Sequence, residues 1–421
     1  MNWFKKLLGL NPSTSTSPRP LKALRGGIVD RDEEFQRLRE RLIATDRLLT
    51  APIVEPVRPI RQKRLADPFQ FLGHGVSSRL REDDGEIERI REFKLPEWRT
   101  PRDVADGLGI TTRQLHWLAY FRSSVRSTHY VYFEIEKSSG GTRTLSAPRP
   151  LMAACQRVIK SEILDRLQTH EAAHGFVPGR SILTSASCHV GREIVVNMDL
   201  RDFFPSIGFV RVRGWFQSHG YCSRVSSLLA LLCTDVIRSP RIDSVGATVW
   251  DSGEGETPSL PQGACTSPAI SNLICSSFDR RVSGLATKLG WTWTRYADDL
   301  TFSANHPESE GVGYLMHRIR GLAAESGFKI SEGKTRVQRR HQRQNVTGLT
   351  VNDRVSVNRK TRRRVRAILH QAKMSGLSAQ NRDNHPDFAQ YLRGLIAHIA
   401  YTNPELGAKL AAQLDEITHG T

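Results

Sequence analysis

Hydrophobic and polar positions repeat with a period of two in three segments, and each of these segments predicts β-structure. Residues 130–148, YVYFEIEKSSGGTRTLSAP, alternate around a Gly-Gly pair, which predicts a β-hairpin. Residues 193–200, EIVVNMDL, open with an apolar β-branched run and end near an acid, which is typical of a buried strand. Residues 291–304, WTWTRYADDLTFSA, predict a strand, a tight turn and a second strand.

Helical periodicity dominates most of the remaining chain. Thr100 is suited to cap a helix in TPRDVADGLGITTRQLHWLAY, where Leu108, Leu115 and Leu118 fall on one face. Residues 151–168 and 267–290 predict two longer helices, and the part beyond them is mainly helical and very basic. Helices packed on a small antiparallel sheet give the α+β class of fold.

Two stretches stand outside this compact pattern. Residues 11–20, NPSTSTSPRP, have linker composition, and residues 31–50 form a charged amphipathic pattern. We therefore assign residues 1–95 to an accessory, helical N-terminal extension and expect the compact part to begin near Pro96. Residues 241–258, RIDSVGATVWDSGEGETP, predict an inserted hairpin to which the sequence assigns no role.

Net charge points to a polyanionic partner. The chain of 421 residues has a formal net charge of +18, which favours binding to nucleic acid. Residues 334–366 contain twelve lysines and arginines against one acid, and they include the candidate RNA-binding residues Arg362, Arg363 and Arg364. The alternative is a solvated basic face.

Composition also excludes several other classes of protein. The six cysteines include no Cys-x-x-Cys pair, so neither a zinc ribbon nor a redox motif is indicated. No apolar run reaches the ~20 residues that cross a bilayer. We therefore expect a cytoplasmic protein with no membrane partner.

Asp199 and the pair Asp298-Asp299 are the candidate catalytic acids. Two adjacent acids in a hairpin repel each other and need a cation to offset the repulsion. Carboxylate oxygens are ligands that suit Mg²⁺. If strand 194–199 pairs beside the hairpin, three carboxylates converge and would hold two Mg²⁺ ions ~3.5–4 Å apart. An isolated Asp-Asp pair is more simply a polar turn, so the neighbouring residues decide between these interpretations.

Three segments around these acids resemble the ordered motifs of the reverse-transcriptase palm: NMDLRDFFPSI, PQGACTSPAISN and RYADDLTFS. The resemblance extends over roughly residues 100–405. It implies a right-hand fingers–palm–thumb polymerase fold, with fingers at 96–190, the palm at 191–350 and a basic helical thumb at 351–421. It also implies an RNA-directed DNA polymerase whose metal-binding acids are Asp199, Asp298 and Asp299.

The same resemblance implies residues that bind the incoming nucleotide. Phe204 matches a bulky gate that clashes with a ribose 2′-hydroxyl and so selects deoxynucleotides; the alternative is ordinary core packing, as expected for Phe203. Gln262 and Gly263 match a motif that contacts nucleotide and template, where a glycine allows close backbone approach.

Basic residues complete the implied nucleotide site. Arg143 matches the arginine that clamps the triphosphate, with Lys137 as a second contact or simply a solvated lysine. Lys334 matches the lysine that protonates the departing pyrophosphate, and a phosphate-binding role is the alternative. Cys265 stands where the family usually has proline, and its small side chain is compatible with a similar turn.

Three further features resemble the bacterial retron reverse transcriptases. Ala186 and His189 resemble the retron Asn-Ala-x-x-His element, with Ser185 in place of the asparagine. Val346-Thr347-Gly348 resembles the Val-Thr-Gly element implicated in recognition of the partner RNA, and YLRGLIAHIAYTNP resembles a retron thumb. The resemblance implies RNA binding by His189, Val346, Thr347 and Gly348. A buried histidine and a plain turn are the alternatives.

Membership of the retron family implies a specific reaction. Such an enzyme uses dNTPs to copy part of a structured noncoding RNA, starting from a guanosine 2′-hydroxyl. The product is a branched, multicopy single-stranded DNA, which serves anti-phage defence together with an accessory effector protein. The alternatives are a group II intron-like or other bacterial reverse transcriptase, and a non-catalytic RNA-binding scaffold, which would lack the acids.

Overall fold

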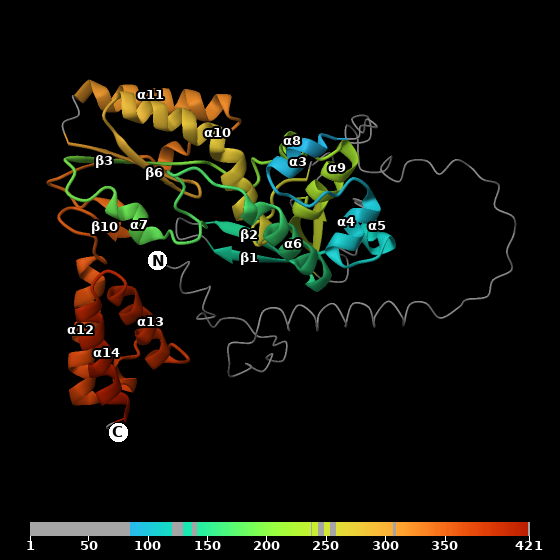
Figure 1. Cartoon of the computed structure of the whole chain (residues 1–421). Coiled ribbons are helices and arrows are strands. Elements are labelled where there is room, and N and C mark those ends of the chain that lie inside the picture. The colour runs from blue at the N-terminus through green and yellow to red at the C-terminus, as the bar shows by residue number, and fades with distance from the viewer. Residues whose placement is uncertain are drawn as a thin grey trace, which may run out of the picture.

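The computed structural model describes residues 85–119, 129–136, 141–236, 238–242, 248–252, 258–305 and 309–419 (Figure 1). The predicted linker, the charged helix at 31–50 and Lys137 lie outside these residues. The described part contains both helices and strands, as the α+β prediction requires. None of its helices has the length and the apolar composition needed to cross a bilayer.

Short helices precede and follow the first hairpin. They are α3 (Ile87–Glu92), α4 (Pro101–Leu108), α5 (Thr112–Ala119), α6 (Pro150–Glu162), the 3-10 turn η3 (Leu164–Arg166) and α7 (Ile182–Ser187). Thr100 caps α4 in a reciprocal capping box with Asp103, which confirms the predicted helix start. The predicted helix at 151–168 ends at Glu162, where η3 takes over.

The compact part begins earlier than Pro96, so the boundary predicted at residue 95 is wrong. Ile90 of α3 and Leu95 are buried in the main core. The backbone N–H of Glu86 donates to the carbonyl of Gly220 at 2.8 Å. The charged sequence of α3, with one buried side chain, gave too weak a periodicity to reveal this packing.

A four-stranded antiparallel sheet carries the predicted acids. Its order is β6 (Thr292–Tyr296), β7 (Asp299–Ala304), β3 (Ile194–Asp199) and β8 (Arg336–Arg339). The predicted strand and the predicted strand–turn–strand segment are both confirmed. The register places Asp199 opposite Asp299 and Asp299 opposite Tyr296, so the acids share one end of the sheet.

Helices α10 (Thr266–Lys288) and α11 (Ser309–Glu325) lie along one face of this sheet (Figure 1). Together with α8 (Phe209–Ser218) and α9 (Ser223–Cys233), they bury one large apolar core that runs from Ile90 to Phe328. Ile194, Val196 and Met198 face this core. Burial of such side chains contributes ~1.5–3 kcal/mol each, which fixes the register of β3 and hence the position of Asp199.

A second core joins the other face of the sheet to the C-terminal helices. Val195 of β3 and Ala186 of α7 contribute to this core from the side of the sheet. The remaining elements there are the 3-10 turn η4 (Glu332–Lys334), β9 (Asn345–Val346), β10 (Leu349–Thr350), α12 (Arg359–Ser375), η5 (Ser378–Gln380), α13 (Phe388–Ala400) and α14 (Pro404–His419). Helix α12 begins at Arg359, within the part of the chain that was predicted to be mainly helical and very basic.

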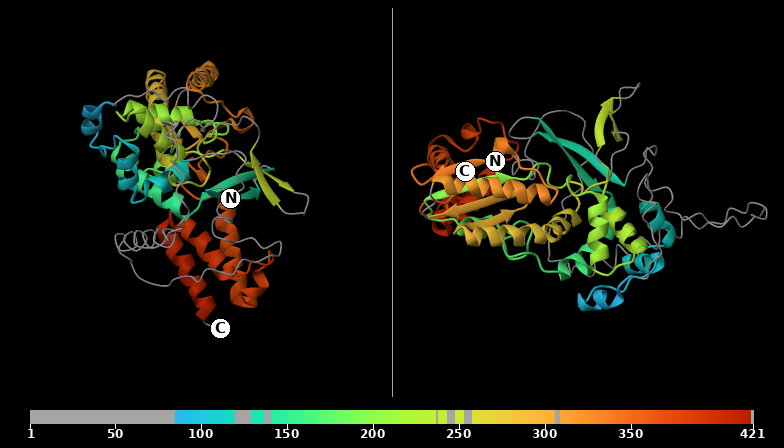
Figure 2. Two further views of the ribbon diagram at one scale, coloured as in Figure 1. Left: turned by 90° about the vertical axis from the view of Figure 1, so that its right-hand side faces the viewer. Right: turned by 90° about the horizontal axis from the view of Figure 1, so that it is seen from above.

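Two hairpins project side by side from the same part of the molecule (Figure 2). One is the predicted pair β1 (Tyr130–Glu136) and β2 (Thr142–Pro148); the other, β4 (Arg238–Ile242) and β5 (Thr248–Ser252), is the predicted insertion. The rings of Tyr132 and Trp250 lie 5.3 Å apart, and the Tyr132 hydroxyl donates to Asp235 at 2.6 Å. The insertion is therefore packed against the first hairpin.

Candidate active site

The three predicted acids converge at one end of the sheet. Asp199 ends β3, Asp299 begins β7, and Asp298 lies in the two-residue turn that precedes β7. The backbone N–H of Leu200 donates to the carbonyl of Asp298 at 2.9 Å, which ties the end of β3 to the turn. The sequence predicted this convergence from the two segments alone.

Crowding of negative charge perturbs the acids. Burial first, and then the charge of Asp199, raises the pKa of Asp298. Asp299 keeps a solvent-exposed side, yet the surrounding protein, followed by Asp298 and Asp199, raises its pKa to about 7. Burial and the neighbouring carboxylates thus disfavour the charged forms of Asp298 and Asp299, and a nearby cation would favour those forms again.

Lys334 is the cation that the protein itself supplies. Its Nζ donates to Oδ1 and Oδ2 of Asp199 at 3.0 and 2.8 Å. Burial lowers the pKa of Lys334, but the hydrogen bond to Asp199 and the charges of all three acids outweigh that effect and raise it. The ammonium group is therefore protonated at neutral pH and lies beside the acids.

The turn that holds Asp298 has a strained backbone. Ala297 has a φ of 55°, in the left-handed region that disfavours a residue with a side chain. A Cβ added to Gly175 would lie 2.7 Å from the Ala297 nitrogen, so the segment around Gly175 presses directly on the turn. Strain of this kind costs ~1–3 kcal/mol and persists only where neighbours enforce it.

A buried ion pair supports the turn from below. Arg295 donates through Nε and Nη2 to both oxygens of Asp279 at 2.8 and 2.6 Å, and both side chains are fully buried. Arg295 Nη1 also donates to Asn272 Oδ1 at 2.9 Å and to the Ala297 carbonyl at 3.2 Å. Asn272 in turn donates to the Gly175 carbonyl at 2.8 Å. The sequence analysis missed this network; an arginine inside an otherwise apolar strand was the available signal.

The predicted nucleotide-binding residues lie on a neighbouring group of elements. The N–H of Ser146 in β2 donates to the Gln262 carbonyl at 2.8 Å. Gly263 has a φ of 133°, and a Cβ there would lie 2.8 Å from the Ser146 carbonyl oxygen, so this position requires glycine. Among the described residues, the buried Gln262 Oε1 has no hydrogen-bond partner. Arg143, also in β2, is close enough to lower the pKa of Asp298.

Phe203 and Phe204 differ in burial, and core packing of Phe203 was expected from the sequence. Phe203 is buried, with its ring 5.7 Å from that of Phe328. Phe204 is only partly buried at the edge of the same core, 5.4 Å from Phe203. Its ring therefore has an accessible surface near the end of β3.

His189 does not fit the predicted contact with RNA. Its side chain is fully buried; Nδ1 lies 2.7 Å from Ser303 Oγ, and Nε2 lies 2.9 Å from Thr294 Oγ1. Burial lowers its pKa to about 3, with Arg192 contributing. The prediction of direct RNA contact is wrong for this side chain, and the buried-histidine alternative holds. Ser185, in the place of the family asparagine, also contacts Thr294 at 2.9 Å.

The Val346-Thr347-Gly348 element is a tight turn between β9 and β10. Val346 is fully buried in the second core, so its side chain is also unavailable to RNA. Thr347 and Gly348 have φ values of 47° and 90°. A β-branched residue rarely adopts a positive φ, which marks the turn as strained. Gly348 is exposed, and Thr347 is partly exposed.

Four arginines in and just before α12 form an arginine cluster, comprising Arg354, Arg359, Arg362 and Arg366. Burial, followed by the charges of the other three, lowers the pKa of Arg362. Among the described residues, Arg362 Nε has no hydrogen-bond partner. The sequence analysis named Arg362 and included the other three only in the basic stretch 334–366, although 359, 362 and 366 have helical spacing.

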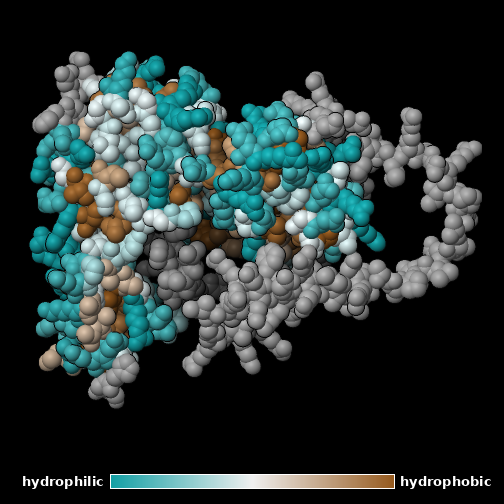
Figure 3. All heavy atoms as spheres, viewed as in Figure 1, coloured by the Kyte–Doolittle hydropathy of each residue, from teal (hydrophilic) through white to brown (hydrophobic). Residues whose placement is uncertain are grey.

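The other two predicted arginines of α12 behave differently. Arg363 is exposed, and Arg364 forms an ion pair with Asp383 at 2.9 Å. The face of the molecule in Figure 3 is mainly hydrophilic, with separate apolar patches. Arg364 is thus partly neutralised, whereas the arginine cluster is not.

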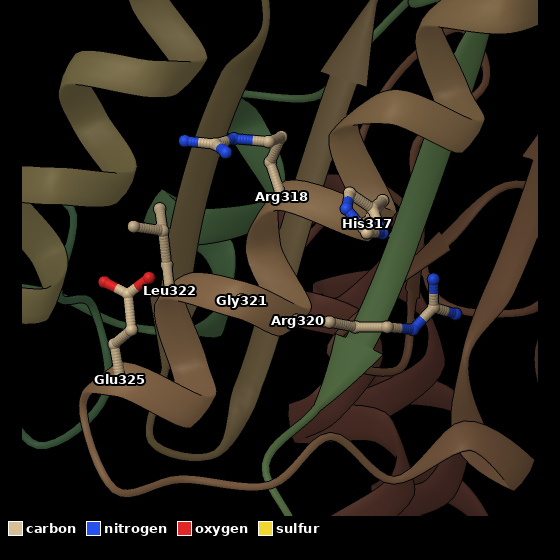
Figure 4. Close-up of a pocket in the computed structure, with 6 residues that line it drawn as sticks. All are labelled: His317, Arg318, Arg320, Gly321, Leu322 and Glu325. Carbon is tan, nitrogen blue, oxygen red and sulfur yellow. The ribbon is translucent and has the colours of Figure 1, made fainter.

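A small pocket of 290 Å³ lies elsewhere, on the outer helix α11 (Figure 4). Its lining includes His317, Arg318 and Glu325, and it contains none of the predicted site residues. Arg320, which also lines it, is paired with Glu332 at 2.7 Å. The pocket therefore adds nothing to the acid site.

The donor set at the acids suits a hard divalent cation, because it offers only carboxylate oxygens. In the part of the chain that the structure describes, no three His, Cys, Asp or Glu side chains are already arranged as a complete metal site. Lys334 holds Asp199 in an ion pair at 2.8 Å. The six cysteines are free thiols, as expected from the absence of a Cys-x-x-Cys pair.

Comparison with known proteins places these features in a family context. The model for "Reverse transcriptase (RNA-dependent DNA polymerase)" matches residues 135–352. Retron Mx65 reverse transcriptase of Myxococcus xanthus is 42% identical over 327 residues, which cover 77% of this chain and 73% of that protein. Retron Mx162 reverse transcriptase of the same organism is 39% identical over 344 residues, covering 78% and 69%. Retron Ec86 reverse transcriptase of Escherichia coli is 31% identical over 285 residues, covering 67% and 81%.

Proposed function

Because this chain belongs to the bacterial retron reverse transcriptases, and is therefore an RNA-directed DNA polymerase, we propose that Asp199, Asp298 and Asp299 are its catalytic acids. The observation that carries the proposal is their convergence beside Lys334 at one end of the sheet. Reverse transcriptases generally use divalent metal ions. We assign two Mg²⁺ ions to these three carboxylates. The ions would supply Lewis-acid activation of the attacking hydroxyl and would neutralise the charge of the leaving group.

The protein's own groups then have distinct roles. The three carboxylates would hold the divalent cations, whose positive charge would position the attacking hydroxyl and the α-phosphate. Lys334 Nζ, which carries a proton at neutral pH, donates it to the departing pyrophosphate. The buried Arg295–Asp279 pair keeps the Ala297 carbonyl, and with it the turn, in a single conformation.

The nucleotide-binding assignments follow from the same proposal. Arg143 clamps the triphosphate, while Gln262 and Gly263 contact the nucleotide, consistent with the unpartnered Gln262 Oε1. In this scheme the sheet is the palm, β1–β2 belongs to the fingers, and α12–α14 form the thumb. The partly buried Phe204 is the gate against ribonucleotides.

Substitution of the gate tests that assignment. Phe204→Ala is expected to raise the ratio of ribonucleotide to deoxynucleotide kcat/KM by roughly tenfold or more, because the clash with the 2′-hydroxyl is removed. Phe203→Leu is the matched control, since Phe203 is buried in the core. Single-nucleotide incorporation on one primed RNA measures both ratios. An unchanged ratio in Phe204→Ala would remove Phe204 from the nucleotide site.

We assign RNA retention to the elements that enclose the second core. The arginine cluster contains four like charges that the described protein leaves close together, and phosphate groups would relieve their repulsion. The strained Thr347-Gly348 turn connects Val346 and Leu349, which are buried in the same core as Val365 of α12. We assign both to a structured noncoding RNA that stays bound to the enzyme.

The product we propose is a branched multicopy single-stranded DNA, primed from a guanosine 2′-hydroxyl of that RNA and used in anti-phage defence with an accessory effector protein. The test is to purify the protein expressed with its native upstream DNA and to examine the bound nucleic acid after RNase treatment. A discrete DNA joined to RNA by a 2′–5′ branch is expected. If the enzyme extends an annealed primer on RNA but carries no such DNA, the polymerase assignment stands and the priming proposal is rejected.

A further inference from the structure

A half-exposed aromatic ring lies beside the catalytic turn without contributing to either core. Phe176 is 52% exposed, and its ring centroid is 6.2 Å from that of Tyr296, two residues before Asp298. Tyr296 itself is partly buried. The Phe176 ring therefore lies exposed next to the turn.

The position of Phe176 is enforced by the network beneath the turn. Phe176 has a φ of 60°, in the left-handed region that a bulky residue rarely adopts. Its neighbour Gly175 is held by Asn272, which donates to the Gly175 carbonyl at 2.8 Å, and is pressed against Ala297. The N–H of His174 donates to the Arg295 carbonyl at 2.7 Å. The same buried groups thus fix the catalytic turn and aim an aromatic ring past it into solvent.

We propose that Phe176 forms a stacking platform for the base of the priming nucleotide, the one whose hydroxyl attacks the incoming dNTP. The proposal rests on the catalytic role assigned to Asp298. A hydroxyl beside Asp298 belongs to a ribose whose base must lie within one nucleotide of the turn. Phe176 presents an exposed ring in that position, and base–aromatic stacking is a general mode of single-strand recognition.

The incoming nucleotide is a less suitable occupant of this platform. Its candidate contacts, Arg143, Gln262 and Gly263, lie on β2 and on the segment that hydrogen-bonds to β2. Phe176 comes from another segment, the loop before α7.

Stacking also suits a primer whose sugar is joined in an unusual way. A ring face recognises a base without reference to the 2′- or 3′-oxygen that reacts, because it contacts neither. The platform would therefore hold a guanosine that reacts through its 2′-hydroxyl and, in later cycles, a DNA end that reacts through its 3′-hydroxyl. Hydrogen bonds to the sugar would favour only one of these geometries.

The test uses a primer with 2-aminopurine as its terminal base, annealed to an RNA template and bound to the full chain in EDTA, where no synthesis occurs. Quenching of the probe reports stacking on a ring. Phe176→Asn removes the ring while tolerating a positive φ, and Phe176→Tyr retains the ring. We expect Phe176→Asn to lose most of the quenching and to weaken binding by about five- to a hundredfold, the range for one lost stack.

Matched controls make the result specific. Phe176→Tyr and Tyr314→Ala, which removes a 52% exposed tyrosine on the outer helix α11, are expected to behave like the wild type. A probe placed six nucleotides upstream is expected to respond equally in all variants. The proposal is overturned if Phe176→Asn and Phe176→Tyr behave alike, or if the upstream probe changes as much as the terminal one.

The same variants separate this proposal from the catalytic one. With Mg²⁺ and dNTPs, Phe176→Asn is expected to raise the KM for the primed template and to leave the KM for dNTP within about twofold. A raised KM for dNTP with an unchanged KM for the primer contradicts the platform. If Asp298→Ala still extends the primer, the catalytic assignment fails, while the quenching experiment still decides whether the base stacks on Phe176.

Discussion

Arg295 and Arg362 are two arginines with opposite electrostatic surroundings. Arg295 is fully buried and forms a two-bond ion pair with the equally buried Asp279. Arg362 is partly buried among Arg354, Arg359 and Arg366, whose charges lower its pKa after burial has done so. The first arginine is satisfied by the protein, whereas the second is placed among like charges.

The three acids repeat the second pattern with the opposite sign. Asp298 and Asp299 have raised pKa values because burial and neighbouring carboxylates disfavour their charge. Clusters of like charge cost folding energy unless a counter-charge arrives. Asp199 has Lys334 as an internal partner, whereas Asp298 and Asp299 have raised pKa values in a cluster of like charge. The comparison therefore separates Arg295, which is fully paired inside the protein, from clusters of like charge that a metal ion or a phosphate would relieve.

The largest effect is expected from removing the acids. Asp298→Ala combined with Asp299→Ala should lower DNA synthesis by at least about a thousandfold, since metal ligation supplies several kcal/mol of the rate enhancement. RNA affinity should stay within about twofold, because the arginine cluster is untouched. Asp106→Ala, at an exposed acid of α4, is the control. Primer extension and filter binding measure the two properties, and undiminished synthesis would refute the mechanism.

Breaking the internal pair should cost stability. Asp279→Ala leaves the buried Arg295 charge uncompensated, so the free energy of unfolding should fall by ~3–5 kcal/mol. Glu416→Ala removes the partner of Lys373 in an exposed pair and should cost at most ~1 kcal/mol. Chemical denaturation at neutral pH provides both values. Equal losses in the two variants would mean that Arg295 and Asp279 behave as a surface pair.

Neutralising the arginine cluster should weaken RNA binding without loss of stability. The combined variant Arg359→Gln, Arg362→Gln and Arg366→Gln should make the slope of log affinity against log salt shallower by about 2–3, as three phosphate contacts require. Stability should hold or rise, because like-charge repulsion is relieved. Arg364→Gln is the control, since Asp383 already neutralises Arg364, and its slope should change less. An unchanged slope in the triple variant would identify a merely solvated face.

His189 sharpens the comparison as a buried group that is kept neutral. Its folded pKa of about 3 lies below the ordinary value of 6.5, so the folded state binds fewer protons between these values. Stability is therefore lost as pH falls below 6.5. The loss from this group should reach ~2 kcal/mol at about pH 5. His189→Gln removes the titration, and denaturation at about pH 7.5 and pH 5 compares the two proteins. Identical pH dependence would assign the effect to other groups.

The acids and hairpins could be predicted from the sequence because their signals are local. The alternation around Gly-Gly, the β-branched run before Asp199 and the strands flanking Asp298-Asp299 each fix an element with little tertiary information. The register that brings Asp199 opposite Asp299 then follows from which face of β3 is buried.

Other residues of the site depend on packing that no local pattern encodes. The burial of His189 and Val346 follows from how α7 and β9–β10 close on the sheet. The arginine cluster combines Arg354 in a loop with three positions of α12, so its fourth member has no helical spacing to reveal it. The sequence analysis did not single out Phe176, whose exposure and positive φ appear only in three dimensions.

The contact between the two hairpins has a mechanical consequence. A two-stranded ribbon alone is marginally stable and bends easily. Here the ring contact of Tyr132 with Trp250 connects β1 to β5, and the hydrogen bond from Tyr132 to Asp235 connects β1 to the segment that leads into β4. Two hairpins in contact resist bending toward the acids more than either hairpin does alone. The inserted strands β4 and β5 thereby act as a brace, setting the stiffness of the arm that carries Arg143.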